Sequence, residues 1–234
     1  MWEYSEIGFA FSPDFSDFSK LQHGFGSTKL TPETLNRFAA EQGLRVVELD
    51  QRHSDSIYTL EAYPQNPLSG DGLVSSRKGL LMVIKTADCL PVLLFDPAQR
   101  VAAAAHCGWK GTSLRLLPKM LALMTSEWGC SLAAIRIALG PCIGPECYEV
   151  GQDLYEVFAG KNLPLSFFSP IAGRQGKYRF DLKASNRAQL LEAGIAAQNI
   201  FSLSYCTHCE KNLYSYRRDA EKAGRLLNFI GWCP

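Results

Sequence analysis

The stretch that decides the fold is residues 80–111, LLMVIKTADCLPVLLFDPAQRVAAAAHCGWKG. It holds three apolar runs of strand length, Leu80–Ile84, Pro91–Phe95 and Val101–Ala105. Short runs of this kind that are bounded by turns are typical of buried strands. Asp96-Pro97-Ala98-Gln99 has the composition of a turn and separates the last two runs. The stretch therefore predicts buried strands that are joined by this turn.

Outward from this stretch, apolar spacing predicts more strands and several helices. Further strands are expected at Arg45–Leu49 and Ile135–Leu139. Helices are expected over residues 31–43, 113–128, 182–193 and 219–229. The first helix begins with Thr31 as N-cap and Pro32 at the first helical position. Pro118, inside the second segment, predicts a kink or a late start.

Strands and helices that mix without strict alternation indicate an α/β (α+β) fold, with a mixed β-sheet and flanking helices in one layered domain. The chain has 234 residues, a length that fits one large domain or two small ones. Residues 159–177 are rich in Pro, Gly and Ser and predict a loop or an insertion, a weak sign of a domain boundary. We therefore expect one domain over residues 1–234.

Composition and charge exclude several classes of protein. Apolar residues make up 47% of the chain and charged residues 20%, as in ordinary globular proteins and unlike disordered, collagen-like or coiled-coil chains. A net charge of +1 gives no electrostatic reason to expect nucleic acid or an anionic membrane as a partner. No uncharged apolar run approaches the ~18 residues that a membrane helix needs.

The number of cysteines and the first residues of the chain indicate in which cellular compartment the protein is expected. Eight cysteines are too few for a disulfide scaffold in a chain of this length. Met1-Trp2-Glu3 is not basic and no apolar segment follows it, so we expect no secretory signal. The sequence predicts a cytoplasmic protein with reduced thiols. In that compartment, cysteines and histidines that gather in the fold are candidates for metal binding or catalysis.

Three such side chains stand at the ends of apolar runs: His53 shortly after Leu49, Cys89 between two runs, and His106 directly after Val101–Ala105. Strand ends and the loops after them are where α/β proteins place their sites. Two imidazoles and one thiolate are a competent set of Zn²⁺ ligands that leaves a fourth position for water or substrate, as in catalytic sites. The alternative, from the residues alone, is a buried apolar Cys89 with hydrogen-bonded histidines.

Seven short blocks carry a family resemblance: His23-Gly24-Phe25, Gln51-Arg52-His53, Asp71-Gly72-Leu73-Val74, Thr86-Ala87-Asp88-Cys89-Leu90-Pro91-Val92, Ala104-Ala105-His106-Cys107-Gly108-Trp109-Lys110-Gly111, Gly140-Pro141-Cys142-Ile143-Gly144 and Ser215-Tyr216-Arg217-Arg218-Asp219. In this order, and over nearly the whole chain, they resemble the YfiH family. That family is also called the laccase-domain or polyphenol oxidoreductase family, and its bacterial members are named peptidoglycan editing factors. The Thr-Ala-Asp-Cys and Ala-His-x-Gly-Trp blocks together are highly specific.

The resemblance implies a single α/β domain with one metal ion, usually zinc with copper as an alternative, held by His53, Cys89 and His106. It implies phosphorolysis of adenosine, inosine and methylthioadenosine and deamination of adenosine, and it links bacterial members to the removal of wrongly built peptidoglycan precursors. The expected partners are a nucleoside and phosphate, and the expected state is a monomer or a weak homodimer. The family's fold is similar to that of certain Cys-His deamidating toxins.

The expected anion-binding residues depart from the family's pattern. Where the family follows His-Gly-Phe with Thr-Arg and a Gly-Gly pair, this chain has Gly26-Ser27-Thr28-Lys29-Leu30. Lys29 can replace the arginine as a point charge but not as a bidentate fork. Lys29, Arg52 and Arg218 are the candidates for binding phosphate or another anionic group of the substrate.

Catalytic roles are expected for Cys89, His106 and Asp88. In phosphorolysis the ribose becomes oxocarbenium-like as the bond to the base loosens, and zinc deaminases need a carboxylate near the metal to move protons. Asp88 is the carboxylate nearest to a ligand in sequence, and its other expected role is to orient a histidine ligand. A true multicopper laccase is excluded because four histidines are too few for its coppers.

Two other functions stay open at this point. Without a metal, Cys89 as thiolate nucleophile and His106 as its base would make a hydrolase or amidase that acts on peptidoglycan precursors. A zinc-dependent binding protein of cell-wall synthesis is the non-catalytic alternative, and no basic stripe in the sequence supports it.

The remaining candidates have more ordinary explanations. Cys206-Thr207-His208-Cys209 is a C-x-x-C motif that can bind metal or cycle as a disulfide, and we favour a structural pair. We also favour a structural role for Cys142. Tyr148 and Trp109 are candidates for stacking on a purine, although such residues are more often part of the core.

Overall fold

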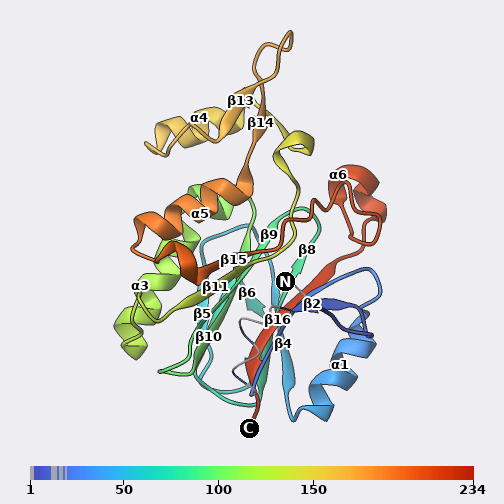
Figure 1. Cartoon of the computed structure of the whole chain (residues 1–234), viewed down its shortest axis with the longest axis vertical. Coiled ribbons are helices and arrows are strands. Elements are labelled where there is room, and N and C mark those ends of the chain that lie inside the picture. Colours follow the sequence, from blue (N-terminus) through green and yellow to red (C-terminus); the bar gives the residue numbers. More distant parts are fainter. Residues whose placement is uncertain (1–2, 12–14, 16–17, 19) are drawn as a thin grey trace.

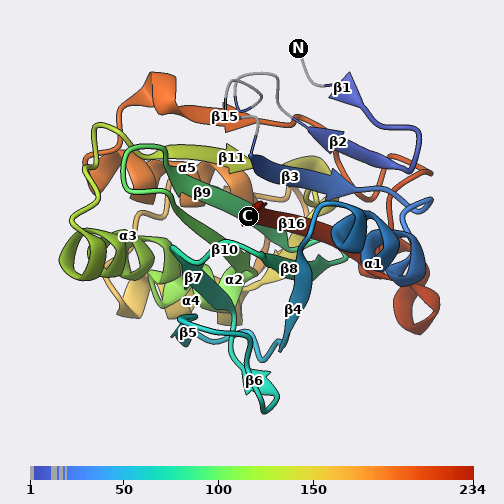
Figure 2. The same cartoon turned by 90° about the horizontal axis from the view of Figure 1, so that it is seen from below.

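Two mixed β-sheets lie face to face in the middle of the molecule, and helices cover their outer faces (Figures 1 and 2). The structure is a computed structural model that describes residues 3–11, 15, 18 and 20–234. Met1 and Trp2, on which the expectation about a secretory signal partly rests, lie outside the described residues. In the part of the chain that is described, no helix is both long and apolar enough to cross a membrane.

The first sheet has seven strands and is antiparallel except around β4, which runs parallel to β6 and β8. The strand order is β1 (Glu3–Tyr4), β2 (Phe9–Phe11), β3 (Leu21–Gly26), β16 (Leu226–Trp232), β8 (Leu80–Thr86), β4 (Arg45–Asp50) and β6 (Leu68–Ser69). The expected strands over residues 45–49 and 80–84 are confirmed and are each slightly longer than the apolar run.

The second sheet has six strands, and its centre is the β9–β10 hairpin predicted from the stretch quoted above. The strand order is β15 (Ile200–Ser202), β11 (Arg136–Leu139), β9 (Leu90–Asp96), β10 (Val101–Cys107), β7 (Gly72–Ser75) and β5 (Ile57–Thr59). The pairs β11–β15 and β5–β7 are parallel and the others antiparallel. The chain therefore passes from the first sheet to the second between β8 and β9, at residues 87–89.

Burial on both faces explains why the central strands have unbroken apolar sequences. On β8, Leu81 and Val83 pack in a cluster with helix α1 (Pro32–Glu41), whereas Met82 and Ile84 pack against the second sheet. Successive side chains of a strand point to opposite faces, so a strand between two layers needs apolar residues at every position. The sequence predicts one mixed sheet, and the structure has two in contact.

Helix α3 (Leu116–Trp128) packs on the second sheet, and the short α2 (Trp109–Ser113) before it also contacts β10. Helix α5 (Leu182–Glu192) packs on α2 and α3. Helix α4 (Gln152–Gly160) packs on β12 and β14. Figure 2 shows α1 and α3 on opposite sides of the sheets. A small antiparallel sheet of β12 (Glu149–Gly151), β14 (Lys177–Phe180) and β13 (Phe168–Pro170) lies beside α4 at the top of Figure 1. Its buried side chains are continuous with the core of the second sheet.

The predicted helix ends are largely confirmed. Thr31 caps α1, because its side-chain oxygen accepts a hydrogen bond from the Thr34 N–H at 3.2 Å. Helix α3 starts late, at Leu116, after Arg115 takes a left-handed conformation with φ 60°. Pro118 therefore lies in the first turn, where a missing N–H leaves no hydrogen bond unmade.

The prediction of a helix over residues 219–229 is wrong. Only α6 (Tyr216–Asp219) and a single 3-10 turn (Ala220–Lys222) precede β16, which lies between β3 and β8. Every residue of β16 is buried, and pairing on both sides satisfies its backbone. Tertiary packing therefore overrides the local helical spacing. The expected loop over residues 159–177 is also partly wrong, because it contains strand β13.

Candidate metal centre and its cavity

The three predicted metal ligands meet at one end of the two sheets. His53 follows β4, Cys89 lies in the connection from β8 to β9, and His106 is near the end of β10. Their ligand atoms all lie within 4.8 Å of one another. The Cys89 sulfur is 3.8 Å from His53 Nε2, and the two imidazole rings meet edge to face with centroids 4.8 Å apart.

The sheet topology brings these side chains together. Strand β4 is parallel to β8, so the loops that carry His53 and Cys89 leave the first sheet at the same end. In the second sheet, His106 lies opposite Pro91, two residues after Cys89. Residues that are far apart in sequence are thus fixed by backbone pairing, which gives the centre a rigid frame.

Asp71, just before β7, organises the centre and was not among the predicted site residues. Its carboxylate is fully buried and its Oδ1 lies 2.8 Å from His106 Nδ1. The same carboxylate accepts hydrogen bonds from the backbone N–H groups of Arg52, His53 and Ser54 and from the Ser54 hydroxyl. His53 has a φ of 57°, a left-handed conformation that these bonds hold in place.

This arrangement leaves the Nε2 atoms of both histidines for a ligand. Because His106 Nδ1 is engaged by Asp71, its Nε2 is the free ring nitrogen. A metal-binding histidine almost always donates its other N–H to a carboxylate or carbonyl oxygen. Two Nε2 atoms and one sulfur, with an outer carboxylate, fit the requirements of a three-ligand zinc site.

Electrostatics also fit a cation at this position. Burial opposes ionisation of the Cys89 thiol, but the charge of His106 and hydrogen bonds from both histidines lower its pKa to about 6. Burial likewise opposes the imidazolium of His106, but the Cys89 thiolate and Asp71 raise the pKa of His106 to about 9. Each group thus stabilises the charged form of the other, a thiolate beside an imidazolium, and a bound cation would take the place of the imidazolium proton.

Gly108 leaves space for two of the candidate metal ligands, Cys89 and His53. A Cβ atom at this position would lie 2.9 Å from the Cys89 sulfur and 3.1 Å from His53 Cδ2. We expect Gly108→Ala to lower zinc affinity by about tenfold or more, as the loss of an outer partner does, because both ligands must move. Competition with a chromophoric chelator measures the affinity.

Gly160→Ala is the matched control, because nothing lies within 4 Å of a Cβ added there. It should leave zinc affinity unchanged. Unchanged affinity in Gly108→Ala as well would show that the ligands tolerate displacement.

A cavity of about 840 Å³ opens beside the three ligands. This volume lies within the range of about 300–1,000 Å³ that is typical of small-molecule sites. Its other lining residues are Glu48, Leu49, Asp50, Gln51, Pro67, Leu68, Lys85, Ala87, Asp88, Ile143, Tyr148, Leu182, Tyr216, Arg217 and Arg225. The wall thus combines three cationic side chains, two tyrosines and several carboxylates with apolar surface.

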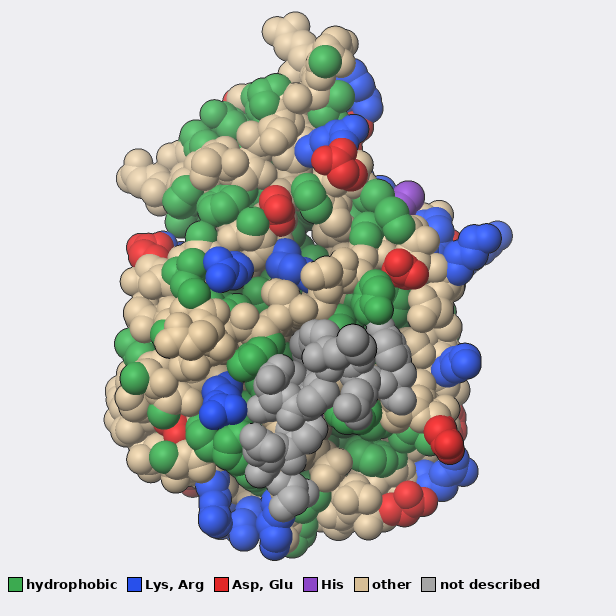
Figure 3. All heavy atoms as spheres, viewed as in Figure 1, with side chains coloured by type: hydrophobic (Ala, Val, Ile, Leu, Met, Phe, Trp, Pro, Cys, Tyr) green, Lys and Arg blue, Asp and Glu red, His purple; other side chains and the backbone are tan. Residues whose placement is uncertain are grey.

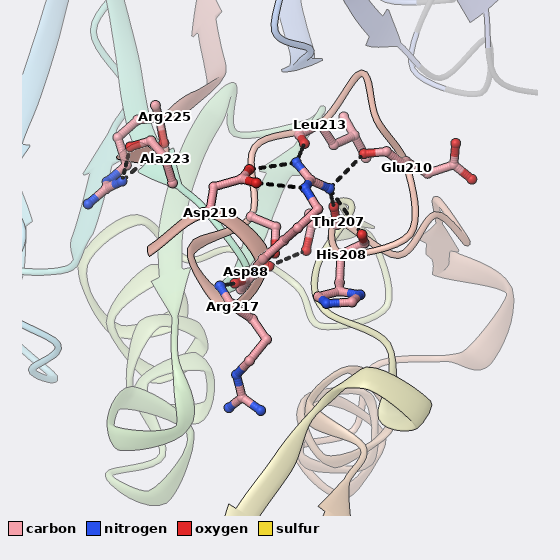
Figure 4. A network of polar contacts seen from close by, with 12 residues as sticks. Asp88, Thr207, His208, Glu210, Leu213, Arg217, Asp219, Ala223 and Arg225 are labelled. Atoms are coloured by element: carbon pink, nitrogen blue, oxygen red, sulfur yellow. Dashed lines mark hydrogen bonds and ion pairs between the residues drawn. The ribbon is translucent and has the colours of Figure 1, made fainter. Parts of the chain in front are cut away.

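Asp88 lines this cavity next to Cys89, but it does not orient a histidine. One of its oxygens accepts a hydrogen bond from the Thr207 hydroxyl and the other from the Arg217 N–H, both at 2.6 Å. Figure 4 shows these bonds between Asp88 and the loop around Arg217. The expected role as the partner of a histidine ligand belongs to Asp71 instead, and the acid–base role stays a prediction.

The three predicted anion-binding residues lie outside the cavity wall. Lys29 is exposed in the turn after β3. Arg52 is exposed and pairs with Asp50 and Ser69. The cations that do line the cavity are Lys85, Arg217 and Arg225.

Arg218 binds its own loop. Its guanidinium donates to the carbonyl oxygens of Thr207, His208, Glu210 and Leu213 at 2.8–3.2 Å and pairs with Asp219 (Figure 4). Adjacent arginines on a short helix point in different directions, and the sequence does not reveal which of them faces the cavity.

The face of the molecule drawn in Figure 3 carries acidic and basic side chains intermixed. Blue and red side chains lie side by side at the right edge of this view, and green apolar surface is spread over the rest of it. No continuous basic stripe crosses this view, consistent with the net charge of +1.

The sequence matches the family described as multi-copper polyphenol oxidoreductase laccase over residues 27–233. Purine nucleoside phosphorylase YlmD of Geobacillus stearothermophilus is 37% identical over 165 residues, which are 69% of this chain and 59% of that protein. Adenosine deaminase RL5, from an unknown prokaryotic organism, is 35% identical over 161 residues, 68% of this chain and 61% of that protein. The matched segment is thus less than two thirds of the length of either relative.

The fold has a close counterpart among solved structures. The crystal structure of the hypothetical protein YfiH of Bacillus licheniformis matches with a TM-score of 0.87 at 28% identity, over 99% of this chain and 98% of that one. The layered α/β architecture of this chain agrees with the family resemblance, but it has two mixed sheets in contact where one was predicted. The sequence match over residues 27–233 and this structural match agree, and the chain belongs to the laccase-like YfiH family.

Proposed function

We propose that this chain is a zinc-dependent purine nucleoside enzyme that phosphorolyses adenosine, inosine and methylthioadenosine and also deaminates adenosine. The observation that carries the proposal is the three-ligand centre at the cavity, with cationic and aromatic side chains in the same wall. The names of its relatives, purine nucleoside phosphorylase and adenosine deaminase, support the same class of substrate.

The centre would hold zinc through His53 Nε2, Cys89 Sγ and His106 Nε2. Imidazole and thiolate ligands suit zinc and also copper, and a fourth position stays open for water or substrate. When bound, zinc acts as a Lewis acid that polarises an oxygen or activates water. The chain's own residues supply the remaining functions: Asp71 orients His106, and Gly108 leaves room for both other ligands.

Binding of phosphate falls to the cations in the cavity wall. Phosphorolysis needs an anion beside the anomeric carbon while the ribose becomes oxocarbenium-like. Lys85, Arg217 and Arg225 line the cavity, and Arg217 is braced by its hydrogen bond to the Glu149 carbonyl at 2.9 Å. These residues replace Lys29, Arg52 and Arg218 in the proposed phosphate site.

Tyr148 is positioned to bind the purine. Its ring lies in the cavity wall under the Arg217 guanidinium, 5.4 Å from the ring centroid. Burial raises the pKa of Tyr148 well above that of a free tyrosine, so its hydroxyl keeps its proton at neutral pH. Tyr148 can therefore offer an aromatic face and a hydrogen-bond donor to the base. Asp88 is the carboxylate proposed to move protons.

One incubation tests the proposal. Metal-replete protein is mixed with adenosine, with and without phosphate, and the products are separated by chromatography. Adenine and ribose 1-phosphate, formed only with phosphate, support phosphorolysis, whereas inosine formed in either condition supports deamination. The absence of both products would overturn the purine proposal.

The phosphate site has its own matched pair of variants. Lys85→Met should raise the KM for phosphate by about tenfold or more, because a hydrogen bond to a charged group contributes about 1.5–3 kcal/mol. Lys29→Met removes an equal charge outside the cavity and should leave this KM unchanged. If the KM for phosphate rose only in the Lys29 variant, phosphate would bind at Lys29, as the sequence predicts.

A second candidate rests on the Cys89, His106 and Asp71 arrangement itself. A low-pKa thiol, an imidazole beside it and a carboxylate behind the imidazole are the parts of a Cys-His nucleophile. This candidate is a metal-independent amidase that acts on peptidoglycan precursors. Covalent labelling of Cys89 by an amide-derived electrophile, in protein that is active without metal, would favour it.

A further inference from the structure

A second group of metal-binding side chains lies apart from the cavity centre. Cys147 belongs to the 3-10 turn Pro145–Cys147, and Cys206, His208 and Cys209 belong to one turn of the loop after β15. The two segments are about sixty residues apart in sequence and meet where residues 142 and 206 form an isolated β-bridge. These four residues are called the loop cluster below.

The distances in the loop cluster match those of a zinc site. The sulfurs of Cys147 and Cys209 are 3.5 Å apart, and the ligand atoms of Cys147, His208 and Cys209 all lie within 4.8 Å of one another. Zn–S bonds of about 2.3 Å in a tetrahedron place two sulfurs about 3.8 Å apart. The thiols are free and do not form a disulfide. The distance between the two sulfurs is therefore close to that between two ligands of one zinc ion.

Cys206 supplies a third sulfur. Its side chain contacts both Cys147 and Cys209, and its sulfur accepts a hydrogen bond from the Gly144 N–H at 3.1 Å. The Cys206 carbonyl accepts the N–H groups of Cys209 and Glu210, which curls the turn so that its side chains converge. Three sulfurs and one imidazole are a donor set of structural zinc sites, and Cys206 would join the other three residues as the fourth ligand.

A positive charge stands behind this turn. Three thiolates and one Zn²⁺ carry a net negative charge, which costs free energy unless a cation lies nearby. The Arg218 guanidinium, which also pairs with Asp219, donates to the carbonyl oxygens of Thr207, His208 and Glu210, which belong to the same turn. Figure 4 shows these carbonyls and the His208 side chain on the loop. Arg218 thus acts on the loop cluster rather than on a substrate.

We propose that Cys147, Cys206, His208 and Cys209 bind a second, structural zinc ion. It would tie the segment that carries Tyr148 to the loop that carries Thr207 and Arg217. Both segments reach the cavity, since Thr207 binds Asp88 and Arg217 lies over the Tyr148 ring. The second ion would therefore hold one wall of the cavity in place without contact with the substrate.

The metal content of the purified full chain tests this proposal independently of activity. Protein expressed with added zinc and freed of loosely bound metal should contain two zinc ions per chain, one for each set of ligands. Cys89→Ala should contain one, because the loop cluster stays intact. Cys147→Ser/Cys209→Ser should also contain one, and Cys233→Ser, which removes a thiol outside both sets, should contain two.

Cobalt in the Cys89→Ala background tests the loop cluster with all its residues present, so a failure of the double variant to fold does not decide the matter. Tetrahedral cobalt with three thiolates should give strong thiolate-to-cobalt absorption in the near ultraviolet, saturating at one equivalent. His208→Ala in this background should weaken cobalt binding and change the visible bands.

Two results would overturn the proposal. The first is Cys89→Ala protein that contains no zinc and gives no thiolate–cobalt absorption. The second is wild-type protein in which thiol titration and peptide mapping find a Cys147–Cys209 disulfide in place of free thiols. Neither result bears on the purine activity, because the cavity centre has separate ligands.

Discussion

Cys89→Ala should remove the zinc ion of the cavity centre and abolish turnover of adenosine. Loss of an outer partner of a metal ligand alone lowers affinity by about 10–100-fold, and the loss of one of three protein ligands should lower it by at least as much. Cys89 is also the ligand whose pKa, about 6, makes it a thiolate at neutral pH. Metal analysis and product chromatography on the same preparation measure both losses.

Two further variants make this result specific. Cys130→Ala removes a buried thiol on the outer face of the second sheet, in the core near α3, and should keep both zinc and activity. Cys89→Asp replaces the thiolate by another metal ligand that cannot act as a sulfur nucleophile. It should retain part of the zinc and part of the activity if the metal carries the reaction. Full zinc with no activity in Cys89→Asp would instead support the Cys-His amidase.

Asp71→Asn should weaken both the metal centre and the fold. The amide cannot accept all the hydrogen bonds that His106, Ser54 and the loop N–H groups give to the carboxylate. Loss of an outer carboxylate partner lowers metal affinity by about 10–100-fold. Breaking a buried ion pair on one side costs about 3–5 kcal/mol, and urea unfolding of metal-free protein measures that loss.

Asp96→Asn is the matched control for Asp71→Asn. Asp96 is also buried and accepts the backbone N–H groups of Ala98, Gln99 and Ser131, but it lies at the other end of the β9–β10 hairpin from the ligands. It should lose stability and keep zinc affinity. If Asp71→Asn and Asp96→Asn bound zinc with equal affinity, Asp71 would contribute to stability and not to the metal centre.

The Asp71 carboxylate should make the free energy of unfolding depend on pH in the acid range. Burial would raise the pKa of Asp71, but hydrogen bonds from His106 and Ser54 hold it well below the value of about 3.9 expected in the unfolded chain. The stabilisation is therefore complete above about pH 4 and is lost as the pH falls further. The difference in the free energy of unfolding between wild type and Asp71→Asn should shrink from pH 5 to pH 3.

The sequence by itself predicted the central strands and the three candidate metal ligands. Runs such as Leu80–Ile84 and Val101–Ala105 are apolar at every position because both faces of each strand are buried, and that pattern is local. His53, Cys89 and His106 stand at the ends of such runs, so their place at a strand edge is also local. The resemblance of the blocks around them pointed to one shared centre, and the structure brings them within 4.8 Å.

Only the tertiary structure decided what depends on contacts between distant segments. Residues 219–229 have helical spacing, but pairing with strands β3 and β8 on either side makes residues 226–232 a strand. The sequence does not show that Asp71 belongs to the site, because its carboxylate meets His106 and the loop after β4 only in the folded chain. Arg217 faces the cavity and its neighbour Arg218 does not, because the turn around His208 takes up the Arg218 guanidinium. Local sequence encodes burial and strand ends, whereas hydrogen-bond partners far along the chain exist only once the sheets have paired.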